Sequence, residues 1–191
     1  EEERNQASKK ARNRVATKVS DSFYSKFRGL VVLVNFTDRK FTRSDYKSVV
    51  TDMLNKENYT GYTNTDGSAN TYGSMFLGSV RDYFADNSYG KFVPQFDVVG
   101  PVTVSYASTD IQQFSYAPSA FYEALQALDS SVDYSKYDAD GDGYVDMVYF
   151  IAAGFGSNYS GNNTNYLWPH KSSLAGDGLW SNDGVKYGTY A

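Results

Sequence analysis

The strongest apolar run in the chain, residues 30–36, is nearly continuous and rich in β-branched side chains. Strands that are buried on both faces of a sheet have this pattern, because neither of their faces meets water. A second run, residues 145–153, predicts another buried strand. Residues 92–97 and 102–106 contain many β-forming side chains on either side of the pair Gly100-Pro101, which predicts a β-hairpin with its turn at that pair.

Three amphipathic stretches predict helices, over about residues 45–56, 80–86 and 119–130. Ser44 and Ser79 are suitable N-caps for the first two, because a serine hydroxyl can accept a hydrogen bond from an unpaired N–H of the first turn. Pro118 fits the first turn of the third helix, where a missing N–H costs nothing.

Two segments rich in Asn, Gly, Ser, Thr and Tyr, residues 57–74 and 154–165, predict long loops. Two shorter strands are predicted near the end of the sequence, over 166–170 and 184–190. Because helices alternate with strands and the first strand is buried on both faces, the pattern favours an α/β or α+β fold with helices packed on a mixed, twisted sheet.

The first 26 residues differ from the rest and are interpreted as a basic leader, followed by one domain over residues 27–191. Residues 1–28 hold eight Lys and Arg against four acidic residues, whereas residues 29–191 hold ten against eighteen. The acidic body argues against a nucleic-acid surface. No apolar run approaches the roughly 20 residues of a membrane helix, so no membrane span is predicted. The leader is read as a solvated tail, with binding to an acidic partner or to the acidic body as the alternative.

The strongest chemical signal is an Asp-rich segment, residues 138–146, called here the 138–146 loop. Asp138, Asp140, Asp142 and Asp146 occupy positions 1, 3, 5 and 9 of an EF-hand-type calcium loop. Gly at the sixth position permits the required sharp turn, and Tyr144 at the seventh offers its backbone carbonyl. Carboxylates this close repel one another, and a hard divalent cation removes the repulsion. Oxygen ligands favour calcium over zinc, so a structural calcium ion is predicted.

The calcium loop is incomplete as an EF-hand. Its twelfth position is Tyr149 rather than Glu, and it falls in a predicted strand where an EF-hand has its second helix. A helix–loop–helix EF-hand is therefore rejected. Asp129, Asp133 and a distant backbone carbonyl are the candidates for the ligand that completes the coordination shell. The alternative is an Asp-Gly turn with solvated carboxylates.

Residues for other catalytic chemistry are scarce. His170 is the one histidine in the sequence, and there is no cysteine. A catalytic zinc site takes about three N, S or O ligands around an open position, and no His-Glu-x-x-His motif is present. His170 is interpreted as a structural, hydrogen-bonded histidine, so no catalytic residue is assigned.

Five segments resemble, in order, the immune inhibitor A-like metallopeptidases, a family of secreted bacterial zinc proteases; they are residues 30–38, 78–91, 132–146, 152–154 and 167–170. The resemblance covers most of residues 29–191, and its specific parts are 79–91 and 132–154. It implies a zincin-like fold, secretion or display on the bacterial cell surface, and endopeptidase activity. It also implies that the zinc-binding helix lies beyond residue 191 and that one late strand pairs with an extended substrate. The basic leader then matches the end of a propeptide.

Three functions follow from these observations. The first is the upstream part of a secreted zinc endopeptidase, whose partners are protein or peptide substrates and its own C-terminal portion. The second is a calcium-stabilised extracellular module that binds protein or glycan through the loops 57–74 and 154–165. The third is a hydrolase that uses His170 without zinc.

Overall fold

The computed structural model describes residues 21–70, 77–112, 116–159, 166–174, 181 and 183–191. The basic leader therefore lies outside the described residues, apart from its end, which forms α2 (Asp21–Lys26). Aromatic contacts hold α2 against the body: the ring centres of Tyr24 in α2 and of Phe27, which follows it, lie 5.4 and 5.3 Å from that of Phe92.

A five-stranded sheet forms the centre of the molecule. Its strands are β1 (Arg28–Asn35), β2 (Gln95–Thr103), β3 (Val148–Ala152), β4 (Ser172–Ser173) and β5 (Thr189–Tyr190). Their order is β2-β1-β3-β5-β4, and only β4, at one edge, runs antiparallel to its neighbour. The mixed sheet and the helices around it confirm the predicted α/β or α+β class.

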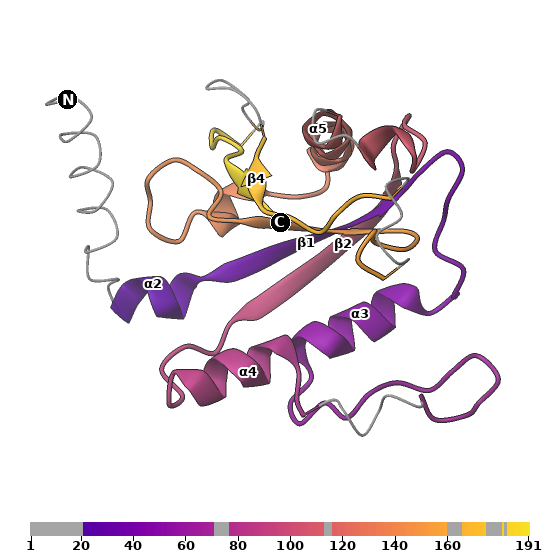
Figure 1. Ribbon diagram of the computed structural model, residues 1–191. Helices are drawn as coiled ribbons and strands as arrows, with labels where there is room; N and C mark the ends of the chain where they lie inside the picture. Colours follow the sequence, from indigo (N-terminus) through magenta and orange to yellow (C-terminus); the bar gives the residue numbers. More distant parts are fainter. Residues whose placement is uncertain (1–20, 71–76, 113–115, 160–165, 175–180, 182) are drawn as a thin grey trace, which may run out of the picture.

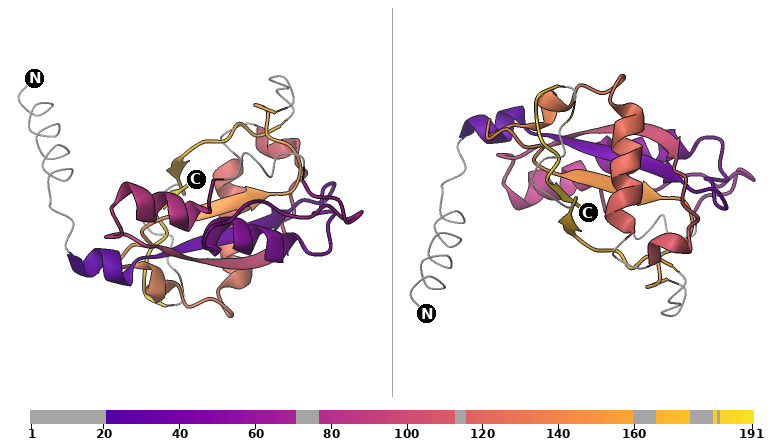
Figure 2. Two further views of the ribbon diagram at one scale, coloured as in Figure 1. Left: turned by 90° about the horizontal axis from the view of Figure 1, so that it is seen from below. Right: turned by 90° about the horizontal axis from the view of Figure 1, so that it is seen from above.

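The helices cover both faces of this sheet. On one face lie α3 (Tyr46–Asn55) and α4 (Val80–Asn87), and on the other lies α5 (Ala117–Leu128), as Figure 1 shows. In the view from above, α5 crosses the strands (Figure 2, right). Two 3-10 turns, η2 (Asp110–Gln112) and η3 (Tyr134–Tyr137), flank α5 in the chain.

Of the two serines predicted to cap helices, one does so and the other does not. Ser79 caps α4 in a capping box, since its hydroxyl accepts from the N–H of Asp82 and its own N–H donates to the Asp82 carboxylate at 2.8 Å. The prediction for Ser44 is wrong: α3 begins after Asp45 and has no side-chain cap. The Asp45 carboxylate is instead held by Arg43 at 2.8 and 2.9 Å.

The predicted hairpin at Gly100-Pro101 is also wrong. The chain runs straight through this pair as the single strand β2, which pairs in parallel with β1. Proline has no N–H to donate, so the ladder is interrupted there and its register shifts between Val32 and Val34. Gly100 has φ +88°, and a Cβ at this position would lie 2.7 Å from the Leu33 carbonyl oxygen. The pair therefore forms a bulge, and only glycine fits at position 100 of it.

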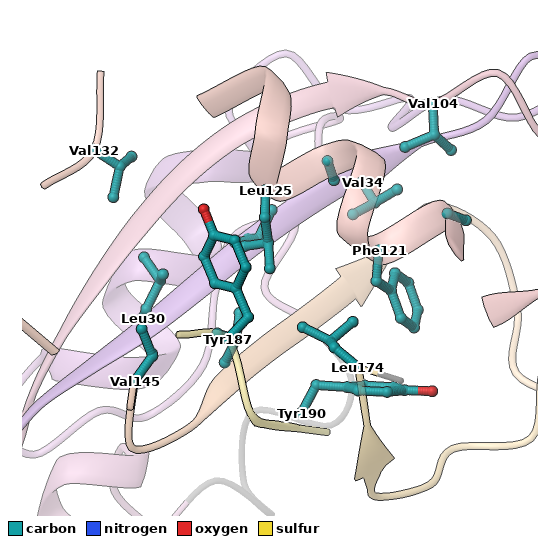
Figure 3. Close-up of a cluster of buried hydrophobic side chains, with 14 of the residues drawn as sticks. Leu30, Val34, Val104, Phe121, Leu125, Val132, Val145, Leu174, Tyr187 and Tyr190 are labelled. Atoms are coloured by element: carbon teal, nitrogen blue, oxygen red, sulfur yellow. The ribbon is translucent and has the colours of Figure 1, made fainter. Parts of the chain in front are cut away.

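The core confirms that the first strand is buried on both faces. Leu30, Val32 and Val34 point to the α5 side of the sheet, while the alternate residues Val31 and Leu33 are equally buried on the other side. Figure 3 shows the α5 side, where Phe121, Leu174 and Tyr190 gather with residues of β1. The apolar face predicted for the third helix is confirmed by the burial of Ala120 and Leu125.

The late strands are shorter than predicted. No strand occupies residues 166–170, which include Pro169, a residue without an N–H to donate to a ladder; the pairing segment is instead β4, which begins two residues further on. Of residues 184–190 only the last two form a strand, β5, which lies inside the sheet rather than at its edge. Within the described residues, no helix has the length and apolarity needed to cross a membrane.

Candidate metal site

The 138–146 loop connects η3 to the start of β3 and brings three carboxylates together. Asp138, Asp140 and Asp142 each offer an oxygen atom, and these oxygens all lie within 4.8 Å of one another. Asp138 is half-buried, whereas Asp140 and Asp142 are exposed to solvent. The predicted calcium ligands at positions 1, 3 and 5 thus converge in space, with one side open to water.

Backbone N–H groups of the loop hold these carboxylates in place. Asp138 accepts hydrogen bonds from the N–H groups of Gly141, Asp142 and Gly143 at 2.8, 3.0 and 3.0 Å. Asp142 accepts in turn from the N–H of Tyr144 at 2.9 Å. Gly141 and Gly143 have positive φ values of +75° and +85°, which lets the backbone curl around the carboxylate of the first position.

Asp146, the fourth predicted ligand, lies outside the group of converging carboxylates and is oriented by the start of the loop. Its carboxylate accepts from the N–H of Ala139 at 2.9 Å, and its own N–H donates to the carbonyl of Tyr137 at 2.8 Å. Burial raises the pKa of Asp146 from 3.8 to about 6; the Ala139 hydrogen bond opposes this, and the charges of Asp140, Asp138 and Asp142 raise it further. The ionised form of Asp146 is therefore disfavoured in the folded protein, mainly by burial and further by the neighbouring carboxylates.

The raised pKa of Asp146 can be tested through the pH dependence of stability. Its folded pKa exceeds its unfolded pKa, so in the ion-free protein its contribution to stability is present below about pH 4 and is lost as the pH rises through about 6. We expect the free energy of unfolding of the native chain, relative to Asp146→Asn, to fall by about 1 kcal/mol across that window. This figure is discounted because the carboxylate is partly solvated.

Urea unfolding of both chains at several pH values, with chelator present, measures this difference. Asn keeps an oxygen for the Ala139 N–H and removes the titration, which makes it the matched control. If the unfolding free energies of the two chains changed in parallel from pH 4 to pH 7, the pKa of Asp146 would not be raised in the folded protein. Calcium at saturation is expected to remove the fall, since the ion favours the ionised carboxylate.

The seventh position of the loop is tied to the end of the chain, which the sequence did not predict. Lys186 donates its N–H to the carbonyl of Gly143 at 2.9 Å and accepts from the N–H of Val145 at 2.9 Å. The backbone of Tyr144, the predicted carbonyl ligand, forms a parallel bridge with Lys186. The Lys186 ammonium lies 5.5 Å from the centre of the Tyr144 ring. A segment about 40 residues later in the chain thus closes one side of the loop.

The two acidic residues considered as additional ligands bind elsewhere. Asp133 caps η3, accepting from the N–H and hydroxyl of Ser135 at 3.2 and 2.6 Å. Asp129 accepts from the Tyr187 hydroxyl at 3.3 Å. In the described part of the chain neither belongs to the group of carboxylates close enough to share an ion. Of the additional ligands considered from the sequence, a distant backbone carbonyl remains.

The residues present do not fit a catalytic zinc ion. Among the described residues, Asp138, Asp140 and Asp142 make up the one group of three or more potential ligands that could hold a metal. Oxygen-only ligands suit calcium, and zinc at a catalytic site takes histidine nitrogens. His170 lies apart from this group: its Nδ1 is 2.8 Å from the Trp168 carbonyl oxygen and its Nε2 is 2.9 Å from the Tyr190 hydroxyl. These contacts agree with the structural role predicted for His170.

Comparison with known proteins adds no assignment. No protein-family model matches the chain. No curated protein gives a significant match to it.

Proposed function

We propose that this chain is the upstream part of the catalytic domain of a secreted zinc-dependent endopeptidase and that its 138–146 loop binds a structural calcium ion. The calcium assignment is carried by one observation, the convergence of the Asp138, Asp140 and Asp142 carboxylates within 4.8 Å. The peptidase assignment rests on the resemblance of residues 29–191 to the immune inhibitor A-like metallopeptidases.

The position of the loop supports a structural role for the ion. The loop leads directly into β3, which is a neighbour of the central strand β1. Through Tyr137 it also reaches the start of the sheet, because the Tyr137 hydroxyl donates to Asp97 at 3.1 Å and Asp97 binds Arg28 in a two-pronged ion pair. An ion in the loop would hold η3, β3 and the end of the chain together, so its binding free energy would add to folding stability.

The sheet edge supports the peptidase proposal. Among the described strands β4 is the outermost and pairs on one side with β5, and its other side would offer backbone N–H and C=O groups to an extended peptide. In a zinc endopeptidase the metal polarises the scissile carbonyl and activates a water molecule. The residues of this chain contribute the substrate-binding edge to such an enzyme, and the zinc ligands come from elsewhere.

A binding module for protein or glycan is the second candidate, and exposed aromatic side chains favour it. Phe155 and Tyr159 are 55% and 75% exposed and stack with ring centres 5.2 Å apart. Trp168 is 50% exposed. Rings that face water in this way provide flat apolar surfaces for a sugar ring or a protein side chain.

A casein-cleavage assay with added zinc distinguishes these functions. We expect the 191-residue chain to be inactive and a longer chain that includes the downstream coding sequence to cleave casein. Activity of the 191-residue chain, free of contaminating protease, would overturn the proposal. In that case His170→Ala tests the third function, because a hydrolase that depends on His170 would lose its activity. An inactive longer chain that binds a glycan array would favour the binding module.

A further inference from the structure

A cavity of about 260 Å³ lies at the end of β3 opposite to the 138–146 loop. It is lined by the segments that follow β1 and β2 and by the end of β3. From β1 the chain passes to α3 on one face of the sheet, and from β2 it passes to α5 on the other face (Figure 1). In sheets of this kind, ligands bind outside the carboxyl ends of the strands, where successive connections diverge.

The walls of the cavity are mostly apolar. Phe36 and Ile111 are fully buried and form one part, while Phe150 and Leu167 are half-buried and form another. Gly154 also lines the cavity and has φ +114°, so any other residue would be strained there, and its Cβ would lie 3.4 Å from the Arg39 side chain. The volume is below the roughly 300–1,000 Å³ of pockets for drug-sized ligands, which restricts the occupant to a small molecule.

One positive charge lines this apolar space. Arg39 is half-buried; its guanidinium donates to the Tyr166 hydroxyl at 3.3 Å and lies 5.5 Å from the centre of the Tyr166 ring. Among the described residues Arg39 forms no ion pair. The neighbouring Asp38 is held instead by Ser108, whose N–H and hydroxyl donate to it at 2.6 and 2.7 Å. A guanidinium has five N–H donors in a planar fork that matches a carboxylate.

We propose that this cavity binds a small carboxylate with a flat apolar body, such as an arylalkanoate. Arg39 binds the carboxylate, the Tyr166 ring holds the guanidinium plane, and the apolar walls enclose the body of the ligand. Phe155, another lining residue, is 55% exposed and adds an aromatic surface to these walls. The proposal goes beyond the proposed function and does not depend on it, because the cavity shares no residue with the calcium loop or with β4.

Calorimetric titration with 3-phenylpropionate and with its uncharged analogue 3-phenylpropionamide tests the proposal. The two probes share their apolar body and differ in the charge that Arg39 recognises. We expect the acid to bind the native chain at least about tenfold more tightly than the amide, since a charge-assisted hydrogen bond contributes about that much. No binding of the acid, or equal affinity for the two probes, would overturn the proposal.

Substitutions locate the binding site. Arg39→Met keeps the apolar stem and is expected to weaken acid binding about tenfold or more, with little effect on the amide. Arg81→Met on α4, far along the chain from the cavity, removes the same charge and is expected to leave both affinities unchanged. If Arg39→Met bound the acid as tightly as the native chain, the assignment of the cavity would be wrong. If Arg39→Met failed to fold, the affinities of the native chain for the acid and the amide would still test the proposal.

Discussion

Chelation of calcium is expected to lower the melting temperature of the chain by roughly 5–10 °C. At a calcium concentration one hundred times the dissociation constant, binding stabilises the folded state by about 2.7 kcal/mol. For a chain of this size, each kcal/mol corresponds to roughly 2–4 °C. The physical reason is the convergence of Asp138, Asp140 and Asp142, which repel one another when no cation is bound.

Circular dichroism melts with calcium and with chelator measure the shift. The matched control is Asp140→Asn with Asp142→Asn, which keeps side chains of the same shape in the loop and removes two of the three converging charges. We expect its melting temperature to respond little to calcium and to lie above that of the native chain in chelator. A native chain that melts at one temperature in both conditions would rule out a stabilising ion.

Truncation of Phe121 to alanine is expected to be the most damaging single change in the core, with a loss of about 3–5 kcal/mol of unfolding free energy. Phe121 is 3% exposed and lies on α5. Its ring stacks on Phe150 of β3 at 4.2 Å and meets Tyr190 of β5 edge-on at 5.2 Å. The substitution thus separates α5 from two strands at once.

The effect of Phe121→Ala is measured by urea unfolding, with Gln126→Ala as the control. Gln126 lies on the solvent side of the same helix, so its truncation is expected to change stability by less than about 0.5 kcal/mol. Because the Tyr190 hydroxyl contacts His170, the Phe121 variant should also alter the environment of the histidine ring, visible in its NMR signals. Equal stability of the two variants would contradict the packing described for α5.

Local patterns in the sequence were sufficient to predict the central strand and the third helix. Residues 30–36 and α5 have strong periodic signals that agree with their burial. The cap at Ser79 was predictable too, because both halves of the capping box lie within three residues. Where one short segment contains all the partners of an interaction, sequence reasoning is reliable.

Other features depended on partners that are distant in sequence. Gly100-Pro101 has the composition of a turn, and only the neighbouring strand β1 shows that it is a bulge in a parallel pair. The pairing of the 138–146 loop with Lys186 and the cation of Arg39 over Tyr166 join segments 40 and more residues apart. The candidate ligands Asp138, Asp140 and Asp142 were predictable because their spacing is local, and their convergence is what the structure adds.

Direct titration of calcium into the chelator-treated chain tests the central claim most directly. We predict one calcium ion per chain, with an affinity at least about tenfold weaker in Asp140→Asn, since one charged ligand is lost. Magnesium is expected to bind more weakly, because it retains its water and demands a more regular shell. A titration that shows no binding, or equal binding by the native chain and the Asp140→Asn variant, would contradict the assignment of the 138–146 loop.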